Sequence, residues 1–380
     1  MHLPEPHVSR DSFFHQTSLS RTSPPTTTCP VTIYFITGNP GLISYYHSFL
    51  SHLSQKLASN PNTTPETEKP SSIHIFGHSL AGFELEQSPK PKGRDGDHYY
   101  SLEEQICFVQ DRLRAHTSAL GREYADADAS STSGPSRPKV ILIGHSVGTY
   151  MAMEILRRHR EELAPIKAQD PSRSENGFAD GDRHDDEAGS QTFDIIGGIM
   201  LFPTVMDIAQ SPSGQKLTFL LRIIPQLALV VSVLARILTS LLSTPILRTL
   251  VRFVMSSPPP EAVDATVSFL RSRRGVRQAL HMAADEMRTI TTDKWSDDVW
   301  GVSRVKEPLT RMFFYFGRND HWVAERTREE IIALKGRKET KMKSGPRMIV
   351  CEEALPHAFC LRHSEVMATK VAGMVAEILR

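Results

Sequence analysis

The chain has 380 residues, 39% of them apolar and 23% charged, which suffices for one large domain or two ordinary ones with buried cores. With 44 basic and 43 acidic residues the net charge is +1, so no overall basic field favours nucleic-acid binding. The four cysteines lack CxxC spacing, and no HExxH or Cys/His cluster occurs. We therefore expect a reducing compartment, with neither a disulfide framework nor a metal site. Residues 1–16 lack the apolar segment of a secretory signal, so we expect none.

In chain order, residues 1–30 are polar and rich in Ser, Thr and Pro, and we expect a disordered tail there. Short apolar runs with many β-branched residues then alternate with helical patterns, one of which begins at a capping box formed by Ser101 and Glu104. This alternation predicts a mostly parallel α/β sheet flanked by helices. The expected strands cover residues 31–37, 72–78, 139–145, 194–202, 311–317 and 347–352.

Two segments interrupt this alternation. Residues 161–192 carry nine acidic and three basic residues and few apolar ones, which predicts a disordered acidic insertion. In residues 203–305 the strand pattern stops and Leu, Ile and Val dominate the middle, so we expect an inserted helical cap with an unusual apolar surface. The α/β core is then expected in two parts, residues 31–202 and 306–380.

The sharpest local signal is Gly144-His145-Ser146-Val147-Gly148, a GxSxG motif between an expected strand and an expected helix. A serine hydroxyl is a weak nucleophile unless it is exposed and held near a base. A tight strand-to-helix turn exposes it, and the flanking glycines permit close packing. We therefore predict Ser146 as a nucleophile presented by Gly144, His145 and Gly148. The alternative is a glycine-rich turn whose serine is satisfied by ordinary hydrogen bonds.

Such a serine needs an acid and then a histidine later in the chain. Asp320 and His357 each follow an expected strand, at the sheet edge where open α/β folds bind ligands. The order Ser146, Asp320, His357 is that of an α/β-hydrolase, in which His357 takes the serine proton and Asp320 fixes its tautomer. Asp320 could instead cap a helix, and His357 could be an ordinary loop residue. Asp207 stays open as another acid, and His321 as another histidine.

Acyl transfer also needs N–H donors for the developing oxyanion. The backbone N–H groups of Asn39, in the turn after the first apolar strand, and of Val147, after the nucleophile, are the candidates, because Pro40 has no N–H. An ordinary Asn-Pro-Gly turn is the alternative. A second serine motif at residues 77–82 reads GxSxA and is not followed by a convincing helix, so Ser79 is the weaker candidate nucleophile.

Three stretches resemble the lipid droplet-associated hydrolase family: residues 36–46 with GNPG and a Tyr-Tyr pair, residues 144–148, and residues 356–359. The resemblance covers residues 31–380 apart from the polar insertions, and its first stretch is the specific one. It implies an α/β-hydrolase fold, no cofactor, and turnover of a hydrophobic lipid ester such as a sterol ester or acylglycerol. It also implies residence on the cytosolic face of lipid droplets and the endoplasmic reticulum. The family's nucleophile, acid and histidine fall on Ser146, Asp320 and His357.

The apolar middle has no Asp or Glu from residue 208 to 260, whereas basic residues recur, which favours contact with anionic headgroups. Prolines and arginines interrupt its apolar runs, so we do not expect a spanning helix, which needs about 20 apolar residues. On a helical wheel of residues 226–243 five polar side chains fall in one stripe that they share with Leu229, and the remaining face is almost entirely apolar, as in a helix lying in a lipid surface.

The expected polar stripe contains Ser232, Arg236, Thr239, Ser240 and Ser243. The expected lipid contacts are Leu227, Val230, Val231, Leu234, Leu238 and Leu241. A helix buried against the core is the alternative. Three functions stay open from the sequence: a serine ester hydrolase at a lipid surface, a droplet coat or tethering protein with little turnover, and an acyltransferase that uses the same triad.

Overall fold

The computed structural model describes residues 7–18, 29–59, 72–85, 98–127, 137–163, 193–224, 226–302, 310–336 and 345–380. These residues build an eight-stranded sheet in the order β1-β2-β4-β3-β5-β6-β7-β8. From β4 to β8 all neighbouring strands are parallel, whereas β1 and β2 are added antiparallel at one edge. The strands are β1 (His7–Val8), β2 (Ser12–Ser18), β3 (Val31–Ile36), β4 (Ser72–His78), β5 (Lys139–His145), β6 (Asp194–Leu201), β7 (Arg311–Phe316) and β8 (Arg347–Val350).

The strands from β3 onward confirm the positions expected from the sequence. Their side chains alternate between the faces, as the two-residue period of a strand requires. In β3, Val31, Ile33 and Phe35 join the core on one face, and Tyr34 and Ile36 join the core on the other. Burial on both faces explains why β3 to β7 read as continuous apolar runs rather than alternating ones, whereas the edge strand β8 is half-buried.

The expected disordered tail is wrong for residues 7–18, which form β1 and β2. Strand β2 pairs with β4 along its whole length and buries Phe13 and Phe14 on opposite faces of the sheet. The polar residues around this phenylalanine pair hide the strand in the sequence, because its pairing with β4 is made by the backbone and leaves no side-chain pattern. The rest of the expected tail up to residue 28 lies outside the described residues.

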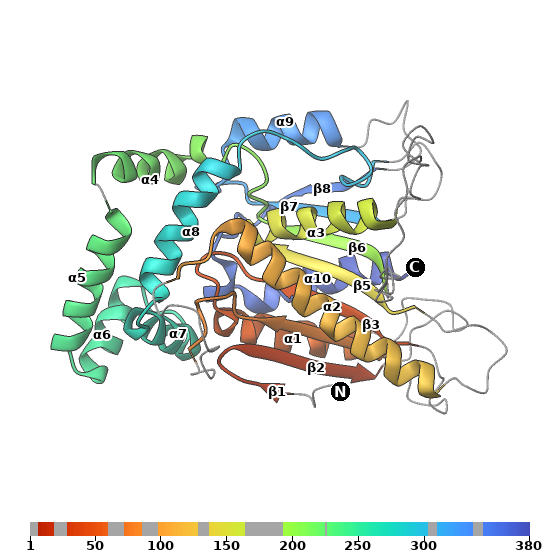
Figure 1. The fold of residues 1–380 in the computed structure, drawn as a ribbon, viewed down its shortest axis with the longest axis horizontal. Coiled ribbons are helices and arrows are strands. Elements are labelled where there is room, and N and C mark those ends of the chain that lie inside the picture. Colours follow the sequence, from red (N-terminus) through yellow and green to blue (C-terminus); the bar gives the residue numbers. More distant parts are fainter. Residues whose placement is uncertain are drawn as a thin grey trace, which may run out of the picture.

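Helices cover both faces of the sheet (Figure 1). Helices α1 (His47–Ser59) and α10 (Ser364–Ile378) pack together on one face, and α2 (Leu102–Ala127), α3 (Val147–Leu163) and α9 (Glu325–Lys335) lie on the other. The start of α2 confirms the expected capping box, because the backbone N–H of Ser101 donates to Glu104 and that of Glu104 donates to the Ser101 hydroxyl. Helix α3 includes the first three residues of the expected acidic insertion, and residues 164–192 are not described.

Between β6 and β7 the chain forms helices beyond the carboxyl ends of the parallel strands (Figure 1). They are α4 (Pro212–Ile223), α5 (Leu227–Leu241), α6 (Thr244–Val254), α7 (Pro260–Arg271) and α8 (Gly275–Thr289). Helices α7 and α8 lie nearer the sheet, and α4–α6 form the outer layer. The expected boundary of this region needs correction at its end. Trp295 and Trp300 are buried in the main core rather than in a separate cap, with Trp300 against Phe314 of β7.

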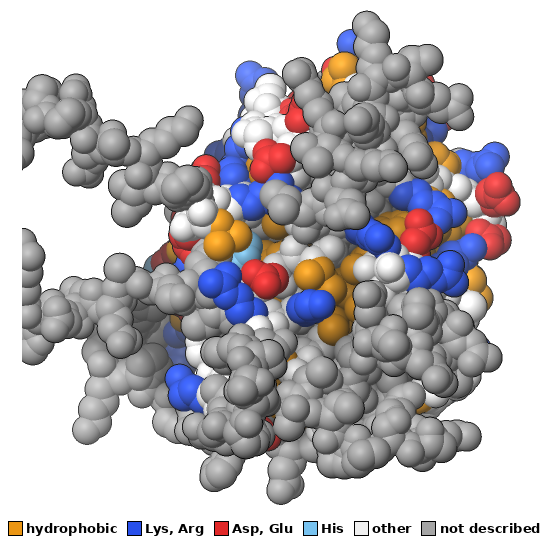
Figure 2. Space-filling view, turned by 90° about the vertical axis from the view of Figure 1, so that its right-hand side faces the viewer, with side chains coloured by type: hydrophobic (Ala, Val, Ile, Leu, Met, Phe, Trp, Pro, Cys, Tyr) orange, Lys and Arg blue, Asp and Glu red, His pale blue; other side chains and the backbone are white. Residues whose placement is uncertain are grey.

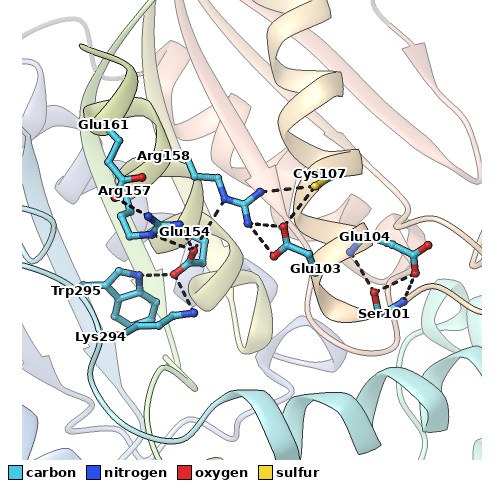
Figure 3. A network of polar contacts seen from close by, with 10 residues as sticks. All are labelled: Ser101, Glu103, Glu104, Cys107, Glu154, Arg157, Arg158, Glu161, Lys294 and Trp295. Carbon is cyan, nitrogen blue, oxygen red and sulfur yellow. Dashed lines mark hydrogen bonds and ion pairs between the residues drawn. The ribbon is translucent and has the colours of Figure 1, made fainter. Parts of the chain in front are cut away.

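A polar network ties α3 to the elements around it (Figure 3). The Glu154 carboxylate is nearly fully buried and accepts hydrogen bonds from Trp295 Nε1 at 2.8 Å and from Arg157, with Lys294 Nζ at 3.2 Å. Arg158 pairs with Glu103 of α2. Burial alone would raise the pKa of Glu154, but Lys294 and Arg157 outweigh burial and hold this pKa below its ordinary value.

Glu154→Ala should lower the free energy of unfolding by about 1–3 kcal/mol, because the buried indole N–H of Trp295 loses its acceptor. A carboxylate with a lowered folded-state pKa stabilises the protein above its unfolded pKa of about 4.3, and that contribution disappears as the pH falls through the folded value. Urea unfolding should therefore show a smaller difference between wild type and Glu154→Gln at pH 3.5 than at pH 7. Glu161→Gln, on the exposed side of Arg157, is the matched control and should change stability by less than about 0.5 kcal/mol. Equal losses in the two glutamine variants would contradict this role of Glu154.

Candidate active site

Ser146 lies on the turn between β5 and α3, and its backbone is in the left-handed region with φ of 54°. This conformation is uncommon for a residue other than glycine and is the strained turn expected for an exposed nucleophilic serine. The turn is held by the Ser146 N–H, which donates to the carbonyl of Leu201 at the end of β6, and by the N–H of Thr149, which donates to the carbonyl of Ser146. The strand, the turn and the helix therefore occur where the GxSxG motif predicts them.

The two motif glycines permit the close packing of this turn. A Cβ atom on Gly144 would lie 2.5 Å from the carbonyl oxygen of Gly148. A Cβ atom on Gly148 would collide with the backbone of Ile36 and Thr37 at the end of β3. Any side chain at either position would push α3 away from the sheet and move Ser146 with it.

The three residues of the expected triad come together from three strand ends. His357, in the loop after β8, has its Nε2 2.8 Å from Ser146 Oγ. Its Nδ1 lies 2.9 and 2.8 Å from the two carboxylate oxygens of Asp320, which follows β7. The Asp320 side chain is buried and also accepts a hydrogen bond from the Trp322 N–H at 2.8 Å. With Asp320 ionised, Nδ1 carries the proton and Nε2 is free to accept the serine proton.

The alternative candidates for nucleophile, acid and histidine lie away from the triad or form other hydrogen bonds. The hydroxyl of Ser79 is buried, donates to Asp11 and accepts from the N–H of Ile43. Asp207 precedes a short 3-10 turn and contacts Gln210 rather than a histidine. His321 is exposed. Among the described residues, Asp320 is thus the carboxylate that contacts His357.

The turn that contains Asn39, the first expected oxyanion donor, passes close to Ser146 at the neighbouring Gly38. A Cβ atom on the preceding residue, Gly38, would be 3.0 Å from Ser146 Cβ, so the turn after β3 passes directly over the serine. The Asn39 side chain points to α8, where its Nδ2 donates to the Ala279 carbonyl and to Glu286 Oε1, both at 2.9 Å. Val147, the second expected donor, is the first residue of α3, and helix N-termini leave backbone N–H groups without intrahelical acceptors.

Sequence reasoning missed a buried hydrogen-bond chain behind the site. The Tyr46 hydroxyl accepts from the Gly38 N–H at 3.2 Å and lies 2.8 Å from His145 Nδ1, and His145 Nε2 lies 2.9 Å from the carbonyl oxygen of His357. Because a carbonyl only accepts, Nε2 of His145 carries a proton. Burial and then the neighbouring His357 lower the pKa of His145 well below its usual value, so it is neutral and its Nδ1 accepts from Tyr46. The chain joins the turn after β3, the serine turn and the histidine loop; its sequence signal is the Tyr-Tyr pair after GNPG.

Most of the large hydrophobic side chains exposed in the described residues lie on α4, α5 and α6. Of the expected lipid contacts on α5, Val230, Leu234, Leu238 and Leu241 are exposed and Val231 is half-buried. Leu227 was expected among them but is buried, with 7% of its surface exposed, because α5 packs on α8 and α7. The expected water-facing stripe is wrong at Ser232, which is buried toward the protein, while Val233 and Ile237 extend the exposed apolar face.

Within the described residues no single helix is long and apolar enough to cross a membrane; α4 and α5 together satisfy the length and composition, but their axes differ by 94°. The end of the molecule opposite α5 has a different surface (Figure 2), where acidic and basic side chains lie side by side among hydrophobic ones. On α4–α6 the exposed charged residues are instead basic, namely Lys216, Arg222, Arg236, Arg248 and Arg252, of which Arg248 pairs with Asp264 of α7. Among the described residues, no group of three or more His, Cys, Asp or Glu could hold a metal ion.

The mostly parallel sheet, the serine on a strand-to-helix turn and the later carboxylate and histidine define the chain as an α/β-hydrolase by fold. A family model described as lipid-droplet associated hydrolase matches residues 29–360, and the chain belongs to that family; it is a hydrolase.

Known proteins agree with this assignment. The lipid droplet-associated hydrolase of Mus musculus is 25% identical over 346 residues, covering 90% of this chain and 84% of the relative. The Homo sapiens protein of the same name is 23% identical over 389 residues, covering 96% and 89%. A solved membrane phospholipase A, a bacterial virulence factor, shares the fold with a TM-score of 0.51 at 13% identity, covering 98% of this chain and 86% of that one.

Proposed function

We propose that the protein is a serine ester hydrolase that cleaves a carboxylic ester of a hydrophobic lipid, a sterol ester or an acylglycerol, at the surface of lipid droplets. The observation that carries the proposal is the chain of hydrogen bonds from Ser146 through His357 to Asp320, with Ser146 on its strained turn. The names of the curated relatives support a droplet surface as the place of action. The cytosolic face of the endoplasmic reticulum is proposed as a second site of residence.

The chemistry follows from the positions of these groups. Ser146 Oγ attacks the ester carbonyl carbon while its proton passes to His357 Nε2, and the N–H groups of Asn39 and Val147 stabilise the oxyanion. The intermediate collapses to an acyl-enzyme, and the leaving alcohol takes the proton from His357. Water then attacks the acyl-enzyme and gives its proton to His357, and Ser146 leaves with that proton as the free acid is released. No cofactor is needed for these steps.

Hydrolysis is tested with purified protein and a panel of sterol esters, acylglycerols and short-chain esters, with Ser146→Ala as the blank. Preference for a long-chain lipid ester presented on an emulsion would support the proposal. Turnover of only a water-soluble ester would contradict the substrate class. Transfer of the acyl group to an added alcohol instead of water would favour the acyltransferase, which shares every step up to the acyl-enzyme. A protein with probe-reactive Ser146 but no turnover of any ester would favour the coat or tethering function, which the exposed apolar helices would equally serve.

We propose that α4–α6 bind the lipid surface without spanning it. Their exposed apolar side chains can enter the lipid while the basic residues meet phosphate headgroups. A droplet presents one phospholipid layer over an apolar interior, which suits helices that lie in the surface. Burying each apolar side chain contributes about 1.5–3 kcal/mol, so a few of them suffice for binding.

The variant Val230→Glu with Leu234→Glu should weaken partitioning onto artificial droplets by at least about 100-fold, because it loses two such side chains and adds two charges. Both side chains are already exposed, so the folded state should tolerate the change. Flotation of droplets with the tagged protein measures the effect. Leu334→Glu with Val366→Glu changes two equally exposed apolar residues on α9 and α10 and should float like wild type. A folded α5 variant that still floats and hydrolyses a soluble ester would rule out this surface.

A further inference from the structure

Glu286 is a buried carboxyl group at the site that the proposed mechanism does not use. It lies on α8 with Gln278 and Met282, four residues apart on the helix face that turns toward the core. Only 4% of Glu286 is exposed. In the described part of the chain, its partner is neither lysine nor arginine but the side-chain amide of Asn39.

The Asn39 amide is fixed by two acceptors on the same helix. Nδ2 donates one hydrogen to the Ala279 carbonyl and the other to Glu286 Oε1, each at 2.9 Å. Because a carbonyl cannot donate, the contact with Ala279 identifies that amide atom as nitrogen. Side chains on a helix point back toward its N-terminus, so Glu286 reaches over the preceding turn toward the Ala279 carbonyl. Two hydrogen bonds from one planar amide fix its orientation, and with it the adjoining backbone.

The backbone of Asn39 carries one of the two N–H groups that stabilise the oxyanion in the proposed mechanism. Gly38 passes directly over Ser146, and its N–H donates a hydrogen bond to the Tyr46 hydroxyl. This hydrogen bond fixes one side of the turn. The other side has its anchor at α8, through the Asn39 amide. We propose that Glu286 is a positioning residue that, through the side chain of Asn39, holds the Asn39 N–H in place for the transition state. This inference rests on the proposed ester hydrolysis.

The chemistry of the carboxyl group fits a neutral hydrogen-bond partner. Burial raises the pKa of Glu286 to about 8, with the Asn39 hydrogen bond opposing this rise, so the group is largely protonated at pH 7. A neutral carboxyl group needs no counterion and still offers its carbonyl oxygen to the amide. Glutamine offers the same oxygen with the same shape, so Glu286→Gln should preserve the anchor, whereas Glu286→Met should remove it at similar volume.

Kinetics on a soluble ester, together with inhibition by an alkyl trifluoromethyl ketone, test the proposal. Ser146 Oγ adds to the ketone carbonyl and its proton passes to His357, which leaves a hemiketal oxyanion at the N–H groups of Asn39 and Val147. Asn39→Ala and Glu286→Met should each lower kcat by about 10–100-fold with KM within about twofold, because small misplacements of a catalytic group cost this much. The affinity for the ketone should fall by a similar factor. The double variant should be no worse than the single ones, and Glu286→Gln should keep kcat within about threefold.

Asp285→Asn is the matched control, because this neighbouring carboxylate on α8 accepts from the Leu102 N–H of α2 instead, and it should leave kcat unchanged. A folded Glu286→Met protein with the kcat and ketone affinity of wild type would overturn the inference. If that variant does not fold, full kcat in Asn39→Ala overturns it equally, since the half-buried Asn39 is the link. Equal loss in Glu286→Gln and Glu286→Met would also overturn it. Wild-type protein without ester turnover or ketone binding would instead refute the proposed function itself.

Discussion

Ser146→Ala should abolish both ester hydrolysis and covalent labelling by a fluorophosphonate, with kcat falling by at least about 10⁴-fold. The reason lies in the turn after β5, where the hydroxyl 2.8 Å from His357 Nε2 is the atom that forms the acyl-enzyme. Alanine removes that atom and leaves the chain around it intact, because Ser146 holds the turn through its backbone N–H and carbonyl. The thermal unfolding midpoint should therefore stay close to that of wild type. Gel-based detection of the labelled protein and initial rates on a short-chain ester measure the two effects.

Ser79→Ala is the control for this substitution, since Ser79 is the serine of the second, GxSxA motif. Its hydroxyl bonds to Asp11 and to the Ile43 N–H, so the change should affect stability but leave labelling in place. Labelling that survives in Ser146→Ala, or that is lost only in Ser79→Ala, would show that another residue is the nucleophile. The difference between the two motifs is structural: Ser79 is followed by a turn, whereas Ser146 is followed by α3.

The sheet could be predicted from the sequence wherever a strand is buried on both faces. Strands β3 to β7 are short apolar runs of this kind, and such runs carry their own signal whatever their neighbours are. Strand β2 carries no such signal, because Phe13 and Phe14 are the only large apolar side chains among its described residues and its remaining order comes from pairing with β4. A pairing between residues far apart in the chain leaves no periodic pattern to find.

The candidate site divides in the same way. Ser146, Asp320 and His357 could be located because each follows a strand, and the carboxyl ends of parallel strands meet at one edge. The roles of Tyr46 and Glu286 could not be predicted from the sequence. Each role depends on a hydrogen-bond partner from another segment of the chain: Gly38 for Tyr46 and Asn39 for Glu286. The one available signal for Glu286 was its place on the face of an amphipathic helix that also carries Met282.

The apolar helices show a limit of wheel arguments. A wheel separates polar from apolar faces but assumes that the polar face meets water. Helix α5 packs on α8 and α7, and Ser232 lies on its buried side. The apolar face is consequently turned outward. An ordinary surface helix has the opposite arrangement, and the lipid-surface proposal needs the outward-facing one.

Asp320→Asn should lower kcat by about 10⁴-fold without unfolding the protein. The Trp322 N–H donates to Oδ1 of Asp320, so the asparagine oxygen will take that place and put its NH₂ group where Oδ2 now lies, 2.8 Å from His357 Nδ1. Nδ1 must then accept from this NH₂ group, whereas in the wild type it donates to the carboxylate, and the imidazole proton shifts to Nε2, facing Ser146. A protonated Nε2 cannot take the serine proton, although the geometry of the site is unchanged. Asp207→Asn is the control and should retain activity, because Asp207 contacts Gln210 instead of a histidine. An active Asp320→Asn enzyme, with activity lost in Asp207→Asn, would move the acid to the end of β6 and overturn the assignment.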